Sequence, residues 1–196
     1  MIAVISNIFV VTHATFWTLY YSVLSVFINY TVGYNRQRTD QHLKGWAKKL
    51  LTRIGLKYKI FKQSEVELQQ GRAYIIMCNH SSFYDIPLTY VSLEGSIRMV
   101  AKKELFRVPI WGKAMEMTEF IKIDRNDPRQ SKKDLQIAME KLQTGLMLWI
   151  APEGTRSRTG EMLPFKKGGF KVAMDMMAII IPMGIRGVNK VFPPNT

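Results

Sequence analysis

The sequence predicts an α/β fold: a mixed or largely parallel central sheet flanked by helices, preceded by an N-terminal motif of two helices that docks on a membrane. Three observations predict it. From residue 60 onward, short apolar runs alternate with longer amphipathic stretches. The first 35 residues contain no Asp, Glu, Lys or Arg, and residues 36–59 then carry a net charge of +7 out of +13 for the chain. A chain of 196 residues is long enough to bury one sizeable core.

The first expected element is an apolar helix over about residues 3–32. A helix of about 30 residues would extend roughly 45 Å, which exceeds the hydrocarbon thickness of a bilayer. Polar residues such as Thr12, His13 and Ser22 dilute the apolar stretch. A tilted span, a re-entrant or interfacial hairpin and a buried helix of a soluble core therefore remain open. A cleaved signal peptide is disfavoured, because no basic region precedes the apolar run.

The second expected element is a basic amphipathic helix over about residues 38–55. Its apolar residues recur with helical spacing and form one stripe: Leu43, Trp46, Ala47, Leu50, Leu51 and Ile54. On an anionic bilayer the Trp46 stripe would sink into the apolar layer while the lysines contact lipid phosphates. The alternative is a solvated basic face above a stripe that packs on the protein's own core. If the first helix spans a membrane, its basic flank predicts that the following chain is cytoplasmic.

We expect residues 1–59 to form the membrane-associated helices and residues 60–196 to form one globular domain. Strands are predicted at residues 73–78, 96–101, 120–123, 145–150 and 178–183, and helices at residues 85–93, 109–117, 129–143 and 168–177. In such sheets, ligands bind near the carboxyl ends of the strands. The loops that follow the strands are therefore where functional side chains are expected.

The loop after the first predicted strand contains His80 and Asp85. At this spacing the two side chains can meet only across a strand-to-helix junction. There Asp85 would hold one imidazole nitrogen while the other accepts a proton from a hydroxyl, as in a general base. The structural alternative is that Ser82 and Asp85 form a capping box and His80 is an ordinary loop histidine. A Cys78/His80 nucleophilic pair is a further alternative, although cysteine in an apolar strand is usually inert packing.

The loop after the fourth predicted strand contains Glu153-Gly154-Thr155-Arg156. A turn with glycine and hydroxyl residues exposes backbone N–H groups, and a guanidinium supplies a planar fork, so this loop is suited to a phosphate. The alternative is a solvated basic loop. Neither a Walker A motif nor a G-x-G-x-x-G motif after a strand occurs, and three histidines with one cysteine give little support for a metal site.

Together, Asn79-His80 with Asp85 five residues later and the segment Pro152-Glu153-Gly154-Thr155-Arg156 resemble the glycerolipid acyltransferase family, specifically 1-acyl-sn-glycerol-3-phosphate acyltransferases of the bacterial type. Residues 120–125 and 180–183 are similar to the second and fourth motifs of that family. The two N-terminal helices resemble its membrane-docking helices. Relatives commonly continue beyond the fourth motif, so both a short protein and a missing C-terminus are compatible with the resemblance.

The resemblance implies transfer of a fatty acyl group from acyl-CoA or acyl-carrier protein to the sn-2 hydroxyl of lysophosphatidic acid, giving phosphatidic acid in phospholipid biosynthesis. It implies that His80 is the base and that Asp85 orients it. The other residues that it implicates are the phosphate contacts Arg156, Glu153, Arg125, Lys102 and Lys103, and the backbone at Gly154 and Thr155 as a contact for the oxyanion. Neither a metal nor a redox cofactor is expected.

The expected partners are a lipid membrane, lysophosphatidic acid and the acyl donor, and nucleic acid is not expected. The expected location is a bacterial inner membrane with the active site on the cytoplasmic side. Two alternatives stay open from the sequence. One is an acyltransferase with another acceptor, namely glycerol-3-phosphate, another lysophospholipid or an aminolipid. The other is a non-catalytic basic module that binds anionic lipid.

Overall fold

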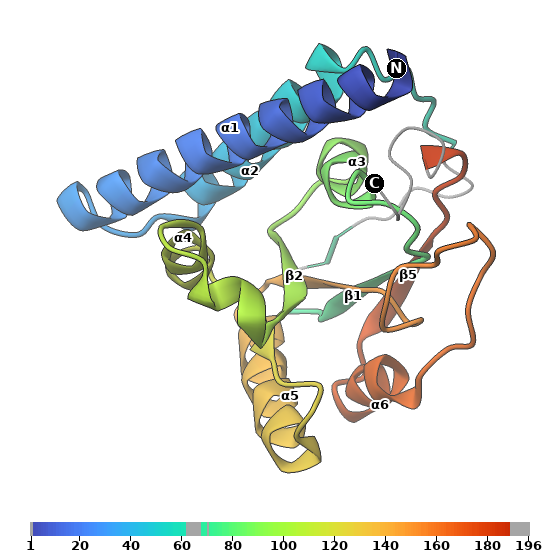
Figure 1. Ribbon diagram of the computed structural model, residues 1–196. Coiled ribbons are helices and arrows are strands. Elements are labelled where there is room, and N and C mark those ends of the chain that lie inside the picture. The colour runs from blue at the N-terminus through green and yellow to red at the C-terminus, as the bar shows by residue number, and fades with distance from the viewer. Residues whose placement is uncertain (1, 62–67, 70, 189–196) are drawn as a thin grey trace.

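The computed structural model describes residues 2–61, 68–69 and 71–188. Within them, the strands are β1 (Tyr74–Cys78), β2 (Ile97–Lys102), β3 (Ile121–Ile123), β4 (Met147–Ile150) and β5 (Ile179–Met183). They form one sheet in the order β3-β2-β4-β1-β5, and every pair is parallel. All carboxyl ends therefore meet at one edge, and the prediction of a largely parallel sheet flanked by helices is confirmed (Figure 1).

The helices of the globular part are α3 (Asp85–Ser92), α4 (Trp111–Met117), α5 (Pro128–Gln143) and α6 (Lys167–Asp175), close to the predicted ranges. Asp127 begins α5 as an N-cap, with its side chain accepting the N–H groups of Arg129 and Gln130. A short 3₁₀ helix, η1 (Lys103–Arg107), follows β2 and was not predicted. One turn of 3₁₀ helix is too short to produce an apolar period in the sequence.

The sheet is covered on both faces, because successive strand residues point to opposite sides. On one face Ile76 and Cys78 of β1 belong to a core cluster that includes Ala47 and Tyr90 from α2 (Arg36–Arg53) and α3. On the other face Ile75 packs with residues of α5 and α6. Figure 1 shows α2 and α3 on one side of the sheet and α5 and α6 on the other. The functional loops lie between these layers at the carboxyl edge.

The apolar stripe of α2 faces the protein and not a bilayer. Ala47, Leu50 and Leu51 are 0%, 4% and 2% exposed, and they pack in the clusters beneath α2. Trp46 donates its indole N–H to Thr18 Oγ1 of α1 (Ile2–Thr31) at 3.1 Å. The expectation that the Trp46 stripe sinks into a membrane is therefore wrong, because α1 and α3 cover it. The solvated-face alternative holds, with Lys48, Lys49 and Arg53 exposed to solvent.

The exposed apolar surface belongs to α1 instead. Residues 8–31 of α1 are long and apolar enough to cross a membrane, and only 17% of the most apolar window is buried. A buried helix of a soluble core is thereby contradicted. The exposed residues include Phe16, Leu19, Tyr20, Val23 and Phe27. The helix still packs on α2 along its other side, where a side chain at Gly45 would put its Cβ 2.8 Å from the Tyr21 hydroxyl.

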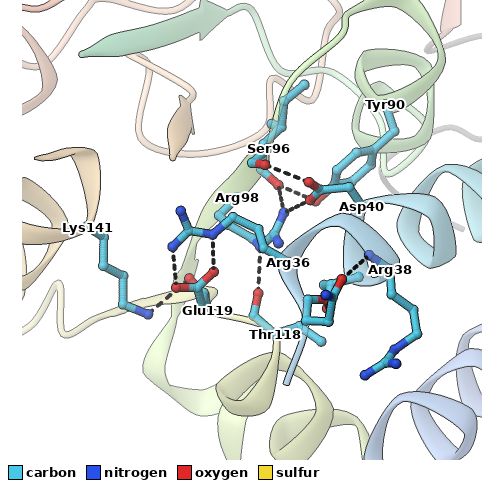
Figure 2. Close-up of polar contacts among 12 residues, drawn as sticks. Arg36, Arg38, Asp40, Tyr90, Ser96, Arg98, Thr118, Glu119 and Lys141 are labelled. Carbon is cyan, nitrogen blue, oxygen red and sulfur yellow. Dashed lines mark hydrogen bonds and ion pairs between the residues drawn. The ribbon is translucent and has the colours of Figure 1, made fainter. Parts of the chain in front are cut away.

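A buried ion pair joins α2 to the amino-terminal end of β2 (Figure 2). The Arg98 side chain is fully buried and donates from Nη1 to Asp40 Oδ1 at 2.6 Å and from Nε to the Thr118 carbonyl oxygen at 2.6 Å. Ser96 Oγ donates to the other Asp40 oxygen at 2.6 Å. Asp40, the acid within the basic segment, thus neutralises a buried cation.

A second pair fixes the start of α2. Arg36 donates from Nε and Nη2 to the Glu119 carboxylate at 3.0 and 2.8 Å, and from Nη1 to the Thr144 carbonyl oxygen at 2.6 Å. The hydrogen bond with Glu119 raises the pKa of Arg36 above its ordinary value, so the guanidinium stays charged. Lys141 donates to the Glu119 carbonyl oxygen at 3.2 Å. Part of the basic charge of residues 36–59 therefore holds the helix pair to the sheet.

We predict that Asp40→Ala destabilises the fold by about 3 kcal/mol, because it leaves the buried Arg98 guanidinium without its counter-charge. Thermal unfolding in detergent, followed by tryptophan fluorescence, measures the change. Glu94→Ala is the matched control, since it breaks the exposed Lys44–Glu94 pair and should cost less than about 1 kcal/mol. Equal effects of the two substitutions would contradict a structural role for the buried pair.

Candidate active site

His80 lies two residues beyond the end of β1 and is held at three points. Its Nδ1 lies 2.8 Å from Asp85 Oδ2. Its backbone N–H donates to Glu153 Oε1 at 2.9 Å, and its carbonyl oxygen accepts the Ser157 N–H at 2.7 Å. Two of these contacts come from the loop after β4, the strand beside β1 in the sheet. The position of the imidazole is therefore set by two loops that are far apart in the sequence.

The Asp85 carboxylate determines which imidazole nitrogen carries the proton. Asp85 is fully buried at the start of α3, and its Oδ2 also accepts the N–H groups of Ser81 and Ser82 at 2.7 and 2.8 Å. Because an ionised carboxylate only accepts hydrogen bonds, Nδ1 is the donor and Nε2 keeps its lone pair. Among the described residues Nε2 has no hydrogen-bond partner, and the His80 side chain is 15% exposed. One carboxylate thus orders the start of the helix and orients the histidine.

The imidazole is also confined by an aromatic ring that the sequence analysis did not identify. Trp149 of β4 lies edge-on to His80, with ring centroids 5.4 Å apart and planes at 84°. Trp149 is in register with Ile76 of β1, which explains how a residue nearly 70 positions away reaches the site.

Asn79 was part of the motif without an assigned role. Its side chain exchanges two hydrogen bonds with the backbone of Ile185, at 2.9 and 2.7 Å, and fixes the chain after β5.

Cys78 is unsuited to the nucleophilic role that the sequence left open. The residue is fully buried at the end of β1. Burial raises the pKa of its thiol far above the ordinary value, and the negative charge of Asp85 adds to the effect. The thiolate, which is the reactive form, is therefore suppressed. Cys78 is packing beneath His80, and the Cys/His alternative is contradicted.

Glu153 links the backbone of His80 to the loop after β4. It is 2% exposed, and while Oε1 accepts the His80 N–H, Oε2 accepts the Leu163 N–H at 2.8 Å. Both carboxylate oxygens are engaged with backbone donors, and a second negative charge would repel a phosphate. These contacts favour an indirect role for Glu153 over the expected direct contact with a substrate phosphate. Glu153 instead ties the loop after β4 to the histidine.

Gly154 also differs from its expected role. Its φ is +74°, a conformation that favours glycine, and its N–H donates to the Ala151 carbonyl oxygen at 2.9 Å to close a turn. That N–H is consequently not free for an oxyanion. A side chain at Gly154 would also collide with Lys166, whose Cδ lies 2.8 Å from the Cβ position. Thr155, the other expected backbone contact, is exposed on the same loop.

The predicted phosphate contacts divide into two groups. Lys103 pairs with Asp124, and Arg125 donates to the Gly154 carbonyl oxygen, so these two cations hold loops together. Arg156 stacks on the ring of Phe83 with its Cζ 3.8 Å from the centroid. Burial lowers the pKa of Arg156, and the charge of Asp85 opposes this shift. The residue after it, Ser157, donates its N–H to the His80 carbonyl oxygen, so the loop that carries Arg156 contacts the histidine segment.

Of the predicted phosphate contacts, Arg156 and Lys102 are the cations that remain available. In the part of the chain that the structure describes, neither has a hydrogen-bond or ion-pair partner. Lys102 is exposed at the end of β2, and Arg156 is partly buried on Phe83. The described residues contain no group of three or more His, Cys, Asp or Glu side chains placed to hold a metal ion. The edge thus combines a histidine with a free Nε2 and a guanidinium with a free donor fork.

The fold and the site define an α/β protein whose oriented histidine can act as a general base next to a cation suited to an anionic substrate. Comparison with known proteins identifies the family. The Acyltransferase family matches residues 59–186, which is more than half of the chain, and the chain belongs to this family.

Several named relatives show similarity over the same region. A chloroplastic 1-acyl-sn-glycerol-3-phosphate acyltransferase of Arabidopsis thaliana is 38% identical over 119 residues, covering 61% of this chain and 33% of the relative. The Helicobacter pylori 1-acyl-sn-glycerol-3-phosphate acyltransferase is 38% identical over 121 residues, and the alignment covers 61% of this chain and 51% of the relative. The matched region thus spans a third to a half of these relatives.

A solved structure agrees with the whole architecture. The crystal structure of the 1-acyl-sn-glycerophosphate acyltransferase from Thermotoga maritima superposes with a TM-score of 0.78 at 23% sequence identity. The superposition covers 98% of this chain and 78% of that one. The two N-terminal helices and the parallel sheet are therefore a shared fold.

Proposed function

We propose that the protein is a 1-acylglycerol-3-phosphate O-acyltransferase. It transfers a fatty acyl group from a thioester donor, acyl-CoA or acyl-carrier protein, to the sn-2 hydroxyl of lysophosphatidic acid and forms phosphatidic acid. The observation that carries this proposal is the 2.8 Å contact between His80 Nδ1 and Asp85, which leaves Nε2 free. The guanidinium of Arg156 supports it by stacking on Phe83, three residues after His80. The names of the relatives support the acceptor.

In the proposed reaction His80 Nε2 removes the proton from the acceptor hydroxyl as its oxygen attacks the thioester carbonyl carbon. The C–O bond forms, and the tetrahedral intermediate carries the negative charge on the former carbonyl oxygen. Its collapse breaks the C–S bond, and the leaving sulfur takes the proton from the His80 imidazolium. Asp85 stabilises that imidazolium from the buried side. The steps need no metal or redox cofactor.

Arg156 and Lys102 are proposed to bind the phosphate of the acceptor. A guanidinium offers parallel N–H donors that match phosphate oxygens, and stacking on Phe83 fixes its plane before the substrate arrives. Lys102 adds a point charge from the end of β2. Arg125, Lys103 and Glu153 are proposed to act indirectly by keeping the loops in place. A phosphate held by the loop after β4 brings the glycerol hydroxyls toward the histidine in the neighbouring loop.

The protein is proposed to work on a membrane through α1. The exposed apolar face of α1 would enter the bilayer, and the exposed Lys48, Lys49 and Arg53 of α2 would contact lipid phosphates. Where α1 spans the bilayer, the basic flank after it favours a cytoplasmic catalytic domain. In a bacterial cell this location corresponds to the cytoplasmic side of the inner membrane. Such docking would deliver a lysolipid acceptor directly from the bilayer.

His80→Ala is expected to reduce phosphatidic acid formation about 100- to 10,000-fold, because the substitution removes the base. Mass spectrometry of phosphatidic acid made from lysophosphatidic acid and acyl-CoA or acyl-carrier protein measures the effect. His42→Ala is the matched control, since His42 lies on α2 outside the site. Equal product from His80→Ala and wild type would exclude His80 from catalysis. A folded wild-type protein inactive with every lysolipid acceptor would favour a lipid-binding module.

Arg156→Ala is expected to raise the KM for lysophosphatidic acid at least about tenfold, because a charge-assisted hydrogen bond is lost, while the KM for the acyl donor stays unchanged. Arg158→Ala is the control for removing an exposed positive charge from the same loop. Steady-state kinetics give the two KM values. A second measurement is the ratio of the activity with lysophosphatidic acid to the activity with a monoacylglycerol that lacks the phosphate. An unchanged ratio in Arg156→Ala would contradict phosphate binding by this residue.

The double substitution Val23→Asp/Phe27→Asp is expected to release the protein from phospholipid vesicles. Each aspartate costs about 2.5–3.5 kcal/mol at the centre of a membrane-inserted helix. Vesicle flotation measures the bound fraction. Ile137→Asp, which alters an exposed apolar residue of α5, should leave it unchanged. Undiminished flotation of the double variant would show that α1 is not the membrane anchor.

A further inference from the structure

The outer face of α6 carries an open groove that the proposed reaction does not use. The groove is lined by Phe165, Lys166, Lys167, Phe170, Lys171, Met174 and Asp175. Its floor is apolar, and the exposed fractions of Phe165 and Met174 are 51% and 71%. Within the described residues, Lys167 and Lys171 have no hydrogen-bond or ion-pair partner. An apolar floor beside unpaired cations marks an interaction surface.

The pattern of the groove follows from the helical period. Lys167 and Lys171 are four residues apart and form one row along α6, and Phe170 and Met174 form an adjacent row. The ring of Phe165 stacks on that of Phe170, with centroids 6.1 Å apart, and extends the apolar row. A partner that matches both rows presents acidic and apolar side chains at the same spacing. An acidic amphipathic helix has this arrangement.

The groove begins at the active-site edge of the sheet. Lys166 is the residue before α6, its N–H donates to the Pro152 carbonyl oxygen at 2.8 Å, and its side chain lies over Gly154. A Cβ at Gly169, in the first turn of α6, would lie 3.3 Å from Ile150 at the end of β4. A partner seated on α6 would therefore lie next to the loop that braces His80.

The groove also faces away from the exposed apolar helix. α6 packs on the sheet face formed by Ile75 and Leu148, whereas α2 and α3 pack on the opposite face, and α1 lies over α2 (Figure 1). With α1 on a bilayer, the outer face of α6 remains open to soluble partners. Its position favours a soluble partner over a lipid surface, and its charge favours an acidic one.

We propose that the groove on α6 docks an acidic amphipathic helix of the carrier protein that bears the acyl thioester. This inference rests on the proposed acyl transfer and names the donor for that site. The lysine row pairs with acidic side chains of the carrier, and Phe170 and Met174 receive its apolar residues. The thioester arm then enters beside Gly154 and reaches His80.

The test compares two donors in one assay. Initial rates are measured with acyl-acyl carrier protein and with acyl-CoA for wild type, Lys167→Glu/Lys171→Glu and Lys132→Glu/Lys133→Glu. The last variant makes the same charge change on exposed residues of α5. We expect the α6 variant to raise the KM for acyl-acyl carrier protein at least about tenfold. Its kinetics with acyl-CoA, and both donors with the α5 variant, should match wild type, and the unchanged acyl-CoA rate shows that the variant is folded.

Three results would overturn the inference. They are an unchanged KM for acyl-acyl carrier protein in the α6 variant, an equal rise for both donors, and a wild-type protein that uses acyl-CoA but not acyl-acyl carrier protein. Each leaves the proposed acyl transfer intact, because activity with acyl-CoA persists. Absence of phosphatidic acid with both donors would instead remove the proposed function and the docking inference with it.

Discussion

The buried carboxylate of Asp85 is the constraint on which the rest of the site depends. One of its oxygens receives the imidazole of His80 and the N–H groups of Ser81 and Ser82. The same contacts fix the turn that leads into α3 and orient the base. Glu153 and Ser157 then hold the backbone of His80 from the loop after β4. The neighbouring strands β1 and β4 make this convergence a consequence of the parallel sheet.

The two ends of the sheet serve different purposes. At the amino end, Asp40 and Arg98, and Arg36 and Glu119, fasten the N-terminal helices to the strands. At the carboxyl end, the loops carry the histidine and the free guanidinium of Arg156. The strands therefore separate the two regions, and the ion pairs hold the N-terminal helices to the sheet at the end opposite His80. The basic residues behind the net charge of +13 lie in four places: the ion pairs with the sheet, the surface of α2, the loops near His80 and the lysine row on α6.

The elements were predictable because their signals are local. Apolar runs with bounding turns gave the strands close to their observed limits, and the spacing of His80 and Asp85 indicated a junction that the structure shows. The role of the Trp46 stripe was not predictable, because an amphipathic pattern does not reveal which apolar surface covers it. The contacts of Glu153 and Gly154 were not predictable for a similar reason. Their partners, the N–H of Leu163 and the carbonyl of Ala151, depend on loop conformations that composition does not determine.

The proposed chemistry requires Asp85 to fix the proton of His80 on Nδ1 and to leave Nε2 basic. Nitrogen-15 NMR of histidine-labelled protein in detergent micelles measures the tautomer of His80 directly, with the resonance assigned by its loss in His80→Ala. We expect the neutral form of the wild-type imidazole to carry its proton at Nδ1, and we expect this preference to be lost in Asp85→Ala. A neutral wild-type His80 with its proton at Nε2, or a tautomer that is insensitive to removal of Asp85, would show that Asp85 does not orient the base.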